Sequence, residues 1–316
     1  FEIDPAEIDK NVKADVAVLG NSKKTLGLLL PLIRENSHES WKKEFDKKYQ
    51  QEFEAVIEND LHPTKPGLTM GEVVEEINKA SKNKAVIVTD VGQHQMWAAQ
   101  YYKYKNPRSN LTSGGLGTMG FALPCSMGAQ LGAKDQQVIA IAGDGGIQMT
   151  LQELGTISQY NIPVKIVILN NHFLGMVRQW QELFFEKRYA STGLTNPDFS
   201  KISEGFGVPA KKITERKDLD KALDDLLAKE GPCVLEIEVK QEGNSLALSL
   251  QEEVEQRIQA AKDPLRAALR VAIAGNIIDY GALHSFDAAV TIEQCFEREF
   301  VVDHYSALRE ALSLHD

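Results

Sequence analysis

Between residues 67 and 243, short apolar runs alternate with amphipathic segments. Four runs are short, apolar and rich in β-branched residues, which is typical of buried strands. They lie at 85–90, 138–142, 164–169 and 234–239. Strands of this kind separated by helices predict an α/β fold with a doubly wound parallel sheet.

The segments between the runs have helical spacing. Two capping boxes, Thr69-x-x-Glu72 and Thr150-x-x-Glu153, predict helices that end near Ser81 and Tyr160. Further helices are predicted within the glycine-rich stretch 114–132, in the apolar-aromatic stretch 174–185 and at 219–227.

The two ends of the chain differ from this central region. In residues 1–35 the run Val16 to Leu19 predicts a strand, and Gly20-Asn21 the turn that ends it. Residues 36–66 predict a linker helix, because Trp41, Phe45, Tyr49 and Phe53 recur every fourth position. Residues 244–316 predict a separate all-α C-terminal segment. We therefore expect four parts, at 1–35, 36–66, 67–243 and 244–316.

Composition narrows the class of protein. A formal net charge of -10 argues against nucleic acid or an anionic membrane surface as the main partner, because both require clustered Lys and Arg. No apolar run approaches the roughly 20 residues of a membrane span. Cys125, Cys233 and Cys295 have no metal-ligand spacing and are odd in number, which favours a reducing compartment, and we expect the cytoplasm. The chain opens on Phe1 without Met or a signal peptide, so we expect it to be a fragment.

Two polar signals follow predicted strands. Gly143-Asp144-Gly145-Gly146 follows the run 138–142, and Asn170-Asn171 follows the run 164–169. Ligands of parallel sheets bind outside the carboxyl ends of the strands. Glycines allow close backbone approach to a phosphate, and carboxylate and amide oxygens suit Mg²⁺. The pair predicts a metal-bridged diphosphate site, the alternative being a tight turn and a helix cap.

These motifs resemble those of the thiamine diphosphate enzymes, in which Gly-Asp-Gly precedes Asn-Asn at this distance. Three further segments resemble the catalytic subunit of acetohydroxyacid synthase, also called acetolactate synthase. They are Val91-Gly92-Gln93-His94-Gln95-Met96-Trp97, Ser113-Gly114-Gly115-Leu116-Gly117-Thr118-Met119-Gly120-Phe121 and Leu174-Gly175-Met176-Val177-Arg178-Gln179-Trp180. The resemblance covers about residues 1–243 and makes residues 1–35 a remnant of a flavin-binding middle domain.

The resemblance implies a role for each matched position. Asp144, Asn171 and the carbonyl of Phe173 would bind Mg²⁺. Met119, Met176 and Trp180 would act at the reacting end, where Met176 presses the cofactor into its bent form and Trp180 sizes the pocket. The residues expected to bind the cofactor are Val91, Gly92, Gln93, His94, Gly117, Met119, Gly143, Asp144, Gly145, Gly146, Asn171, Leu174, Gly175 and Met176.

Each assignment has a structural alternative. The methionines could fill gaps in a core, His94 could begin a helix, and Trp180 could be a packing anchor. The run Gly115 to Gly120 also matches the dinucleotide fingerprint by letter. We do not favour a nicotinamide site, because residues 109–113 are not an apolar strand and no acidic residue ends a following strand at the expected distance.

The resemblance implies a transferase of branched-chain amino acid biosynthesis. It would condense pyruvate with a second 2-oxo acid to acetolactate or acetohydroxybutyrate, using thiamine diphosphate and Mg²⁺, as a cytoplasmic homodimer, with FAD in the complete family enzyme and a regulatory small subunit as a possible partner. The activating Glu of that family belongs to an N-terminal domain and acts across the dimer interface. We therefore expect this chain alone to bind thiamine diphosphate weakly or not at all and to have no synthase activity.

The tail resembles a different family. Asp263-Pro264 through Asp279 is similar to the helical N-terminal region of damage-control metal phosphatases. Asn276 and Asp279 could line a phosphate site there or simply cap a helix and form a turn. Three interpretations stay open: a synthase module, a metal-dependent phosphatase fragment and a non-catalytic assembly of two partial domains.

Overall fold

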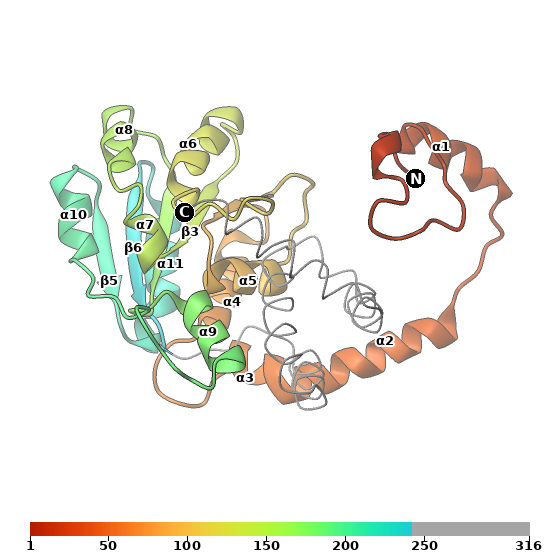
Figure 1. Cartoon of the computed structure of the whole chain (residues 1–316). Coiled ribbons are helices and arrows are strands. Elements are labelled where there is room, and N and C mark those ends of the chain that lie inside the picture. The colour runs from red at the N-terminus through yellow and green to blue at the C-terminus, as the bar shows by residue number, and fades with distance from the viewer. Residues whose placement is uncertain (242–316) are drawn as a thin grey trace, which may run out of the picture. The chain divides into compact units, whose positions relative to one another are not determined.

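The computed structural model describes residues 1–241 and divides the chain into two compact units, Phe1–Gln51 and Glu52 onward (Figure 1). The predicted helical tail at 244–316 lies outside the described residues. No described helix is long and apolar enough to cross a membrane.

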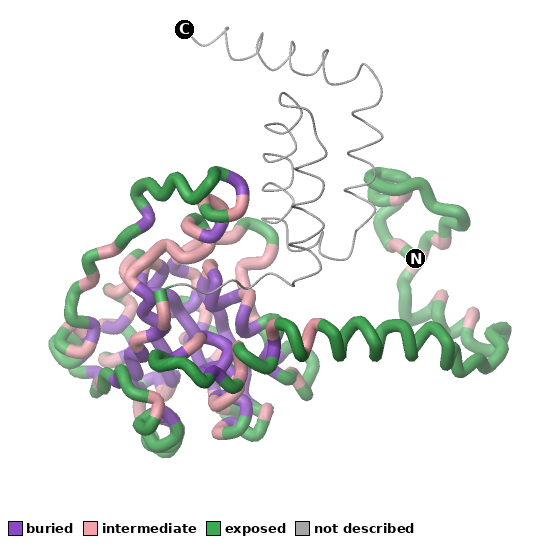
Figure 2. The backbone as a smooth tube through the Cα atoms, turned by 90° about the horizontal axis from the view of Figure 1, so that it is seen from below, coloured by how far each residue is buried: buried purple, intermediate pink, exposed green. Residues whose placement is uncertain are grey.

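The first unit is small and largely exposed. It contains the 3₁₀ turns η1 (Pro5–Glu7) and η2 (Leu30–Leu32), helix α1 (Ser22–Leu29) and most of helix α2 (Glu39–Glu52). None of residues 1–51 is buried, as the exposed colouring in Figure 2 shows. The strand predicted at Val16 to Leu19 is wrong, because the pairing is confined to one parallel bridge between Glu2 and Leu19. No longer ladder flanks that bridge among the described residues.

The helix predicted within residues 36–66 is present as helical structure of two kinds, α-helical and π-helical. Helix α2 continues into a π-helical turn, η3 (Phe53–Ile57), and then α3 (Glu58–Leu61). Ile57 is the first buried residue of this stretch and joins the core of the second unit.

The second unit is built on a six-stranded parallel sheet of order β2-β1-β3-β4-β6-β5. The strands are β1 (Val86–Thr89), β2 (Asn110–Thr112), β3 (Val138–Gly143), β4 (Lys165–Asn170), β5 (Ala210–Ile213) and β6 (Cys233–Glu238). The fold class predicted from the hydrophobic pattern is confirmed.

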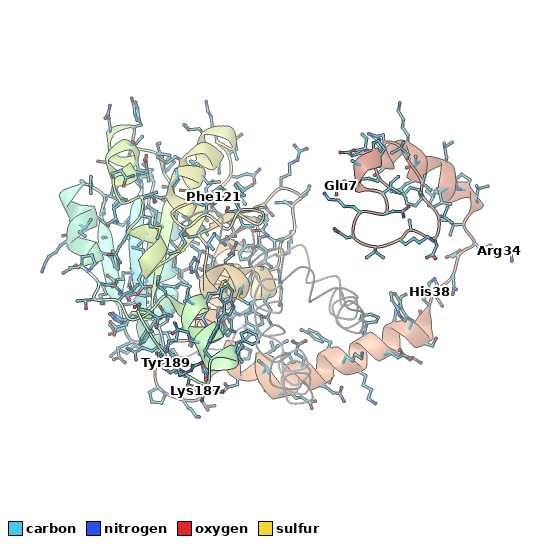
Figure 3. All side chains as sticks on the ribbon, viewed as in Figure 1. Glu7, Arg34, His38, Phe121, Lys187 and Tyr189 are labelled. Carbon is cyan, nitrogen blue, oxygen red and sulfur yellow. The ribbon has the colours of Figure 1, made fainter. Side chains whose placement is uncertain are left out.

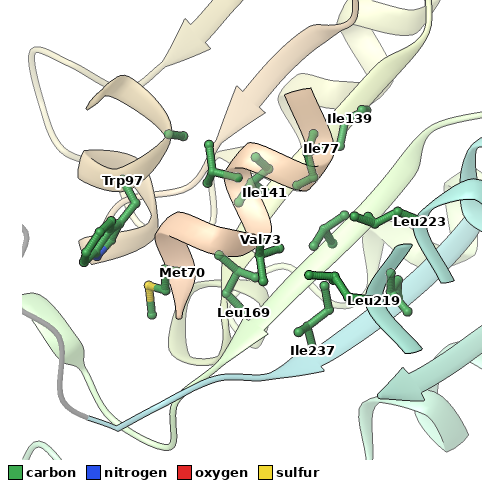
Figure 4. Close-up of a cluster of buried hydrophobic side chains, with 14 of the residues drawn as sticks. Met70, Val73, Ile77, Trp97, Ile139, Ile141, Leu169, Leu219, Leu223 and Ile237 are labelled. Atoms are coloured by element: carbon green, nitrogen blue, oxygen red, sulfur yellow. The ribbon is translucent and has the colours of Figure 1, made fainter. Parts of the chain in front are cut away.

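Helices cover both faces of this sheet because successive strand residues point to opposite faces. Ile139 and Ile141 join one core with α4 (Met70–Ser81), α5 (Gln93–Tyr101) and α11 (Leu219–Ala228), as Figure 4 shows. The other core contains residues of α6 (Ala122–Gly132), α8 (Glu153–Gln159) and α10 (Phe199–Gly205). The remaining elements are α7 (Asp144–Ile147), α9 (Gly175–Phe184) and the 3₁₀ turn η4 (Arg216–Asp218).

One of the two predicted capping boxes forms. Thr69 Oγ1 accepts from the Glu72 amide at 3.1 Å, and the Glu72 carboxylate accepts from the Thr69 amide at 3.4 Å. The second box is wrong. Helix α8 begins at Glu153 itself, and the Thr150 hydroxyl donates instead to the Gly120 carbonyl at 3.0 Å.

Several elements were not predicted from the pattern. Residues 109–113, interpreted as no apolar strand, contain the short edge strand β2, whose residues are only partly buried. Helix α5 was also missed, since apolar and polar residues surround it almost evenly, as were α10 and β5.

Candidate functional site

The site lies at the point where the chain reverses its direction of travel across the sheet. From β1 the chain moves outward to β2, and it then crosses back to β3 on the other side of β1. The crevice outside the carboxyl ends of such a strand pair is the usual ligand site of a doubly wound sheet. Here the loop after β1 carries residues 90–93, and the segment after β3 carries Asp144 to Gly146.

A cavity of about 220 Å³ occupies this position. The resemblance singled out segments from four separate parts of the chain, and the structure brings all of them to its wall. Every residue predicted to bind the cofactor or metal or to act at the reacting end lines it: Val91, Gly92, Gln93, His94, Gly117, Met119, Gly143, Asp144, Gly145, Gly146, Asn171, Phe173, Leu174, Gly175, Met176 and Trp180. The cavity does not test the individual roles, which remain predictions.

Three glycines of this wall have no room for a side chain. A Cβ on Gly146 would lie 2.8 Å from Asp90 Cγ, one on Gly145 would lie 2.7 Å from Leu174 Cδ2, and one on Gly175 would lie 2.8 Å from Asn171 Nδ2. Contacts under 3 Å force a shift of the neighbour. The backbone is therefore the surface that a ligand meets here, which suits a group that binds main-chain N–H donors.

Asp90 connects this wall to the glycine-rich loop before α6. Its buried carboxylate accepts from the amides of Val91 at 2.8 Å, Gly120 at 2.9 Å and Ala122 at 3.0 Å. One side chain at the end of β1 thus fixes the end of a loop that begins more than twenty residues later.

Asp144 is the candidate metal ligand with a charge. Its carboxylate accepts from the Gly145 amide at 3.1 Å and from Asn196 Nδ2 at 2.6 Å. Burial raises the pKa of Asp144 above its usual value, while these hydrogen bonds act in the opposite direction. A bound cation would favour the charged carboxylate at this buried position.

No group of three or more His, Cys, Asp or Glu among residues 1–241 is arranged to hold a metal. Any ion here would rely on one carboxylate together with amide, main-chain and ligand oxygens. That donor set fits Mg²⁺, which typically binds one or two carboxylates and completes its shell with phosphate oxygens and water. Asn171 and Phe173 are held together at this point, because the Phe173 amide donates to Asn171 Oδ1 at 3.2 Å.

His94 presents a buried imidazole to the same cavity. It packs against Gly92 and Gly143, where an added Cβ would lie 2.8 Å from the ring in either case. Burial lowers the pKa of His94 to about 4, although the nearby Asp90 opposes this shift. Its Nε2 has no hydrogen-bond partner among the described residues. The ring is therefore neutral near pH 7 and has one nitrogen left for a ligand.

Helix α9 supplies Met176 and Trp180. Its Gln179 is buried and accepts from Gln93 Nε2 at 3.0 Å, which joins α9 to the start of α5. Arg178 packs its guanidinium against the rings of Phe173 and Tyr189, at 4.3 and 3.8 Å from the centroids. Figure 3 labels Tyr189 on the segment that follows α9. These contacts stabilise the helix next to the predicted metal ligands.

Sequence reasoning missed several residues of the site. Asp90 was seen only as the end of a strand, although a carboxylate at the carboxyl end of a buried strand is itself a site signal. Glu236 is 1% exposed within β6, and a charge inside the apolar run 233–237 was the signal for it. Asn196 stands in a polar segment before α10 with no distinguishing pattern.

Comparison with known proteins supports the resemblance. Residues 90–237 match the family described as "Thiamine pyrophosphate enzyme, C-terminal TPP binding domain", and residues 237–316 match "Damage-control phosphatase ARMT1-like domain". Over 253 residues the chain is 42% identical to the acetolactate synthase large subunit of Parasynechococcus marenigrum, covering 77% of this chain and 39% of that protein.

Other relatives agree. The acetolactate synthase isozyme 2 large subunit of Escherichia coli is 39% identical over 245 residues, which are 76% of this chain and 42% of that protein. The mitochondrial catalytic subunit of Saccharomyces cerevisiae is also 39% identical, over 76% of this chain and 35% of that protein. The chain thus spans about two fifths of the length of these relatives. Both resemblances predicted from the sequence are confirmed.

Proposed function

We propose that this cavity binds thiamine diphosphate with Mg²⁺, and that the chain acts in the condensation of pyruvate with a second 2-oxo acid to acetolactate or acetohydroxybutyrate. The observation that carries the proposal is the convergence of four distant segments on one cavity at the reversal point of the sheet. The similarity to acetolactate synthase large subunits gives this cavity its substrate class.

The diphosphate end would lie over Gly143 to Gly146 and His94. Crowding by Asp90 and Leu174 keeps Gly146 and Gly145 free of side chains, so their backbone can approach phosphate oxygens. His94 is neutral near pH 7 and its ring already donates to the Asp90 main chain, so the free Nε2 would accept a hydrogen bond from a donor of the ligand or from water. Asp144, Asn171 and the Phe173 carbonyl would hold Mg²⁺.

The cavity also has apolar lining residues. Met119, Met176 and Trp180 line it together with Leu116 and Val177, and the first three would face the reacting atoms. When bound, thiamine diphosphate supplies the carbanion chemistry that decarboxylates pyruvate and joins the remaining two-carbon unit to the second 2-oxo acid. The protein would supply orientation, and Met176 would support the cofactor while Trp180 would limit the size of the second substrate.

The proposal extends to the assembly that such a reaction uses in the family. We infer a homodimer, with FAD bound in the complete enzyme and a regulatory small subunit as a further partner. The names of the relatives, "large subunit" and "catalytic subunit", support the last of these.

Calorimetric titration of the chain with thiamine diphosphate and Mg²⁺ tests the site. Asp144→Ala should abolish binding because it removes the one charged ligand. Asp135→Ala, at an exposed turn before β3, is the matched control and should bind as the wild type does. Equal binding by the Asp144 and Asp135 variants would refute the site. Because the activating Glu of the family is expected outside this chain, acetolactate formation is tested on the chain joined to an N-terminal domain that supplies it. Absence of acetolactate from such a protein, despite cofactor binding, would refute the reaction.

A second candidate function rests on the match of residues 237–316 to the damage-control phosphatase domain. Under this alternative the chain would release phosphate from a phosphorylated substrate in a Co²⁺- or Ni²⁺-dependent manner. Phosphate release that survives Asp144→Ala would support it and would assign the activity to the tail.

A further inference from the structure

Asn196 lies directly behind the predicted metal ligands. Its Nδ2 donates to Asp144 Oδ2 at 2.6 Å and to Asn170 Oδ1 at 2.9 Å, so both N–H groups of the amide are used. Its Oδ1 accepts from Gln148 Nε2 at 3.1 Å, and Gln148 also donates to the Asp144 carbonyl at 2.9 Å. One amide thus joins the carboxylate after β3 to the asparagine that ends β4.

Asn170 is held from its other end by a buried charge. Its Nδ2 donates to Glu236 Oε1 at 2.9 Å, and the same oxygen is 3.1 Å from Lys212 Nζ on β5. Glu236 is 1% exposed and projects among apolar residues, since Val234 on the same face of β6 belongs to the core there. A buried carboxylate is costly without partners. The contacts of Oε1 with Asn170 and Lys212 lower this cost, whereas Oε2 has no partner among the described residues.

These contacts form a continuous chain of side chains from the edge of the sheet to the site. It runs from Lys212 through Glu236, Asn170 and Asn196 to Asp144. None of the first four lines the cavity. They act on the site only through the orientation of Asp144 and of the segment at Asn170-Asn171.

The effect on Asp144 follows from hydrogen-bond geometry. One carboxylate oxygen accepts from the Gly145 amide and the other from Asn196, so the rotation of the group is fixed from both sides. Each oxygen keeps a second lone pair for a cation. A ligand held in its binding orientation binds a metal more tightly, and residues that hold metal ligands typically contribute about 10- to 100-fold in affinity.

We propose that Asn196, supported by Asn170 and Glu236, is a positioning residue for Mg²⁺. This inference rests on the proposed function, because it takes Asp144 as the metal ligand. It adds that affinity for Mg²⁺ depends on an amide that touches neither the cofactor nor the cavity.

The test is the dissociation constant of Mg²⁺, measured by calorimetry on the full chain at saturating thiamine diphosphate. Asn196→Ala removes the amide, and Asn196→Leu removes it while keeping most of its volume. Both should weaken Mg²⁺ about 10-fold or more. Glu236→Gln keeps an acceptor for Asn170 but loses the charge, and it should weaken Mg²⁺ by less.

Asn78→Ala is the matched control. Asn78 is a buried asparagine that donates to the Tyr101 carbonyl at 2.8 Å and accepts from the Lys103 amide at 3.0 Å, away from the cavity. It should lower the melting temperature without changing the Mg²⁺ constant. Thermal melting without ligands separates a loss of fold from a loss of metal affinity.

The outcomes distinguish the two proposals. If the wild type binds Mg²⁺ and both Asn196 variants bind it within twofold of that value, the positioning role is wrong and the site stands. The role is also wrong if Asn196→Leu binds normally while Asn196→Ala does not, since packing would then explain the loss. If the wild type shows no Mg²⁺-dependent cofactor binding, the proposed function falls and this inference with it.

Discussion

Gly146→Ala should destabilise the second unit, although alanine is the better helix former. Gly146 lies within α7, so the substitution gains about 1 kcal/mol from helix propensity alone. Against this gain, the new methyl group would lie 2.8 Å from Asp90 Cγ and closer still to Oδ1. Asp90 has no free direction in which to move, because its oxygens accept three main-chain hydrogen bonds.

The magnitude follows from two costs. Overpacking of a close-packed site typically costs about 1–3 kcal/mol. Losing one hydrogen bond to a charged acceptor costs about 1.5–3 kcal/mol more. After subtracting the propensity gain, we expect the free energy of unfolding to fall by about 3 kcal/mol. With a urea dependence of about 2 kcal/mol per molar, the unfolding midpoint should drop by about 1.5 M.

Urea unfolding followed by tryptophan fluorescence is a suitable assay, because Trp97 is buried in the core of this unit. The matched control is Gly128→Ala in α6, where an added Cβ has no heavy atom within 4 Å. That variant should gain about 0.5–1 kcal/mol from propensity. The reasoning is refuted if the two variants shift the midpoint in the same direction.

Three further predictions concern other parts of the second unit. Lys165→Met should lower the free energy of unfolding, measured in urea, by about 2–4 kcal/mol. The buried Lys165 ammonium donates to the carbonyls of Lys229 at 2.5 Å and Gly231 at 2.6 Å, and the substitution would leave both carbonyls unpaired. Cofactor affinity should stay unchanged, because this end of β4 is opposite the cavity. Burial raises the pKa of Asp60 from a usual value of 3.8 to about 6. Between these two pH values the folded state binds more protons than the unfolded state. The stabilisation by the protonated carboxyl group is therefore present at low pH and should be lost as pH rises through 6. Asp60→Asn should flatten that part of the pH profile of unfolding, and an unchanged slope would contradict the assignment. Arg216→Met should make residues 63–67 more sensitive to protease. Arg216 pairs with Glu72 and donates to the carbonyls of Gly67 at 2.7 Å and Lys65 at 3.2 Å. Cleavage of the variant at the wild-type rate would contradict this prediction.

The sheet was predictable because its strands are buried on both faces and therefore read as continuous apolar runs. The edge strands β2 and β5 were not predicted, because they are partly exposed and carry polar residues and therefore do not form continuous apolar runs. Capping boxes show a different limit. Thr69 and Thr150 occur in the same local sequence pattern. The hydroxyl of Thr150, however, donates a hydrogen bond to the carbonyl of Gly120, thirty positions away, and a local pattern cannot predict such a contact.

The site likewise contains residues that local motifs predict and residues that are brought together only by the fold. The residues lining the cavity were predicted because they occur in motifs that resemble a known family. Asn196, Asn170 and Glu236 come from three different elements and meet only through the pairing of β4 with β6 and the return of the chain before α10. Asn170 stands in a motif and Glu236 is a charge within an apolar run, but no local pattern shows that these two residues and Asn196 meet, so only the folded structure identifies their contacts.

The crowded glycines have a consequence for how this sequence can change. Gly146 is blocked by Asp90, Gly145 by Leu174, and Gly175 by Gln93 and Asn171. Each glycine is therefore paired with a side chain from another segment, and a side chain added at the glycine requires that neighbour to shift. Variation at this site should be accepted in pairs, so a library that randomises one loop at a time would recover few folded variants, whereas one that varies both members of a pair would reach sequences that single steps cannot.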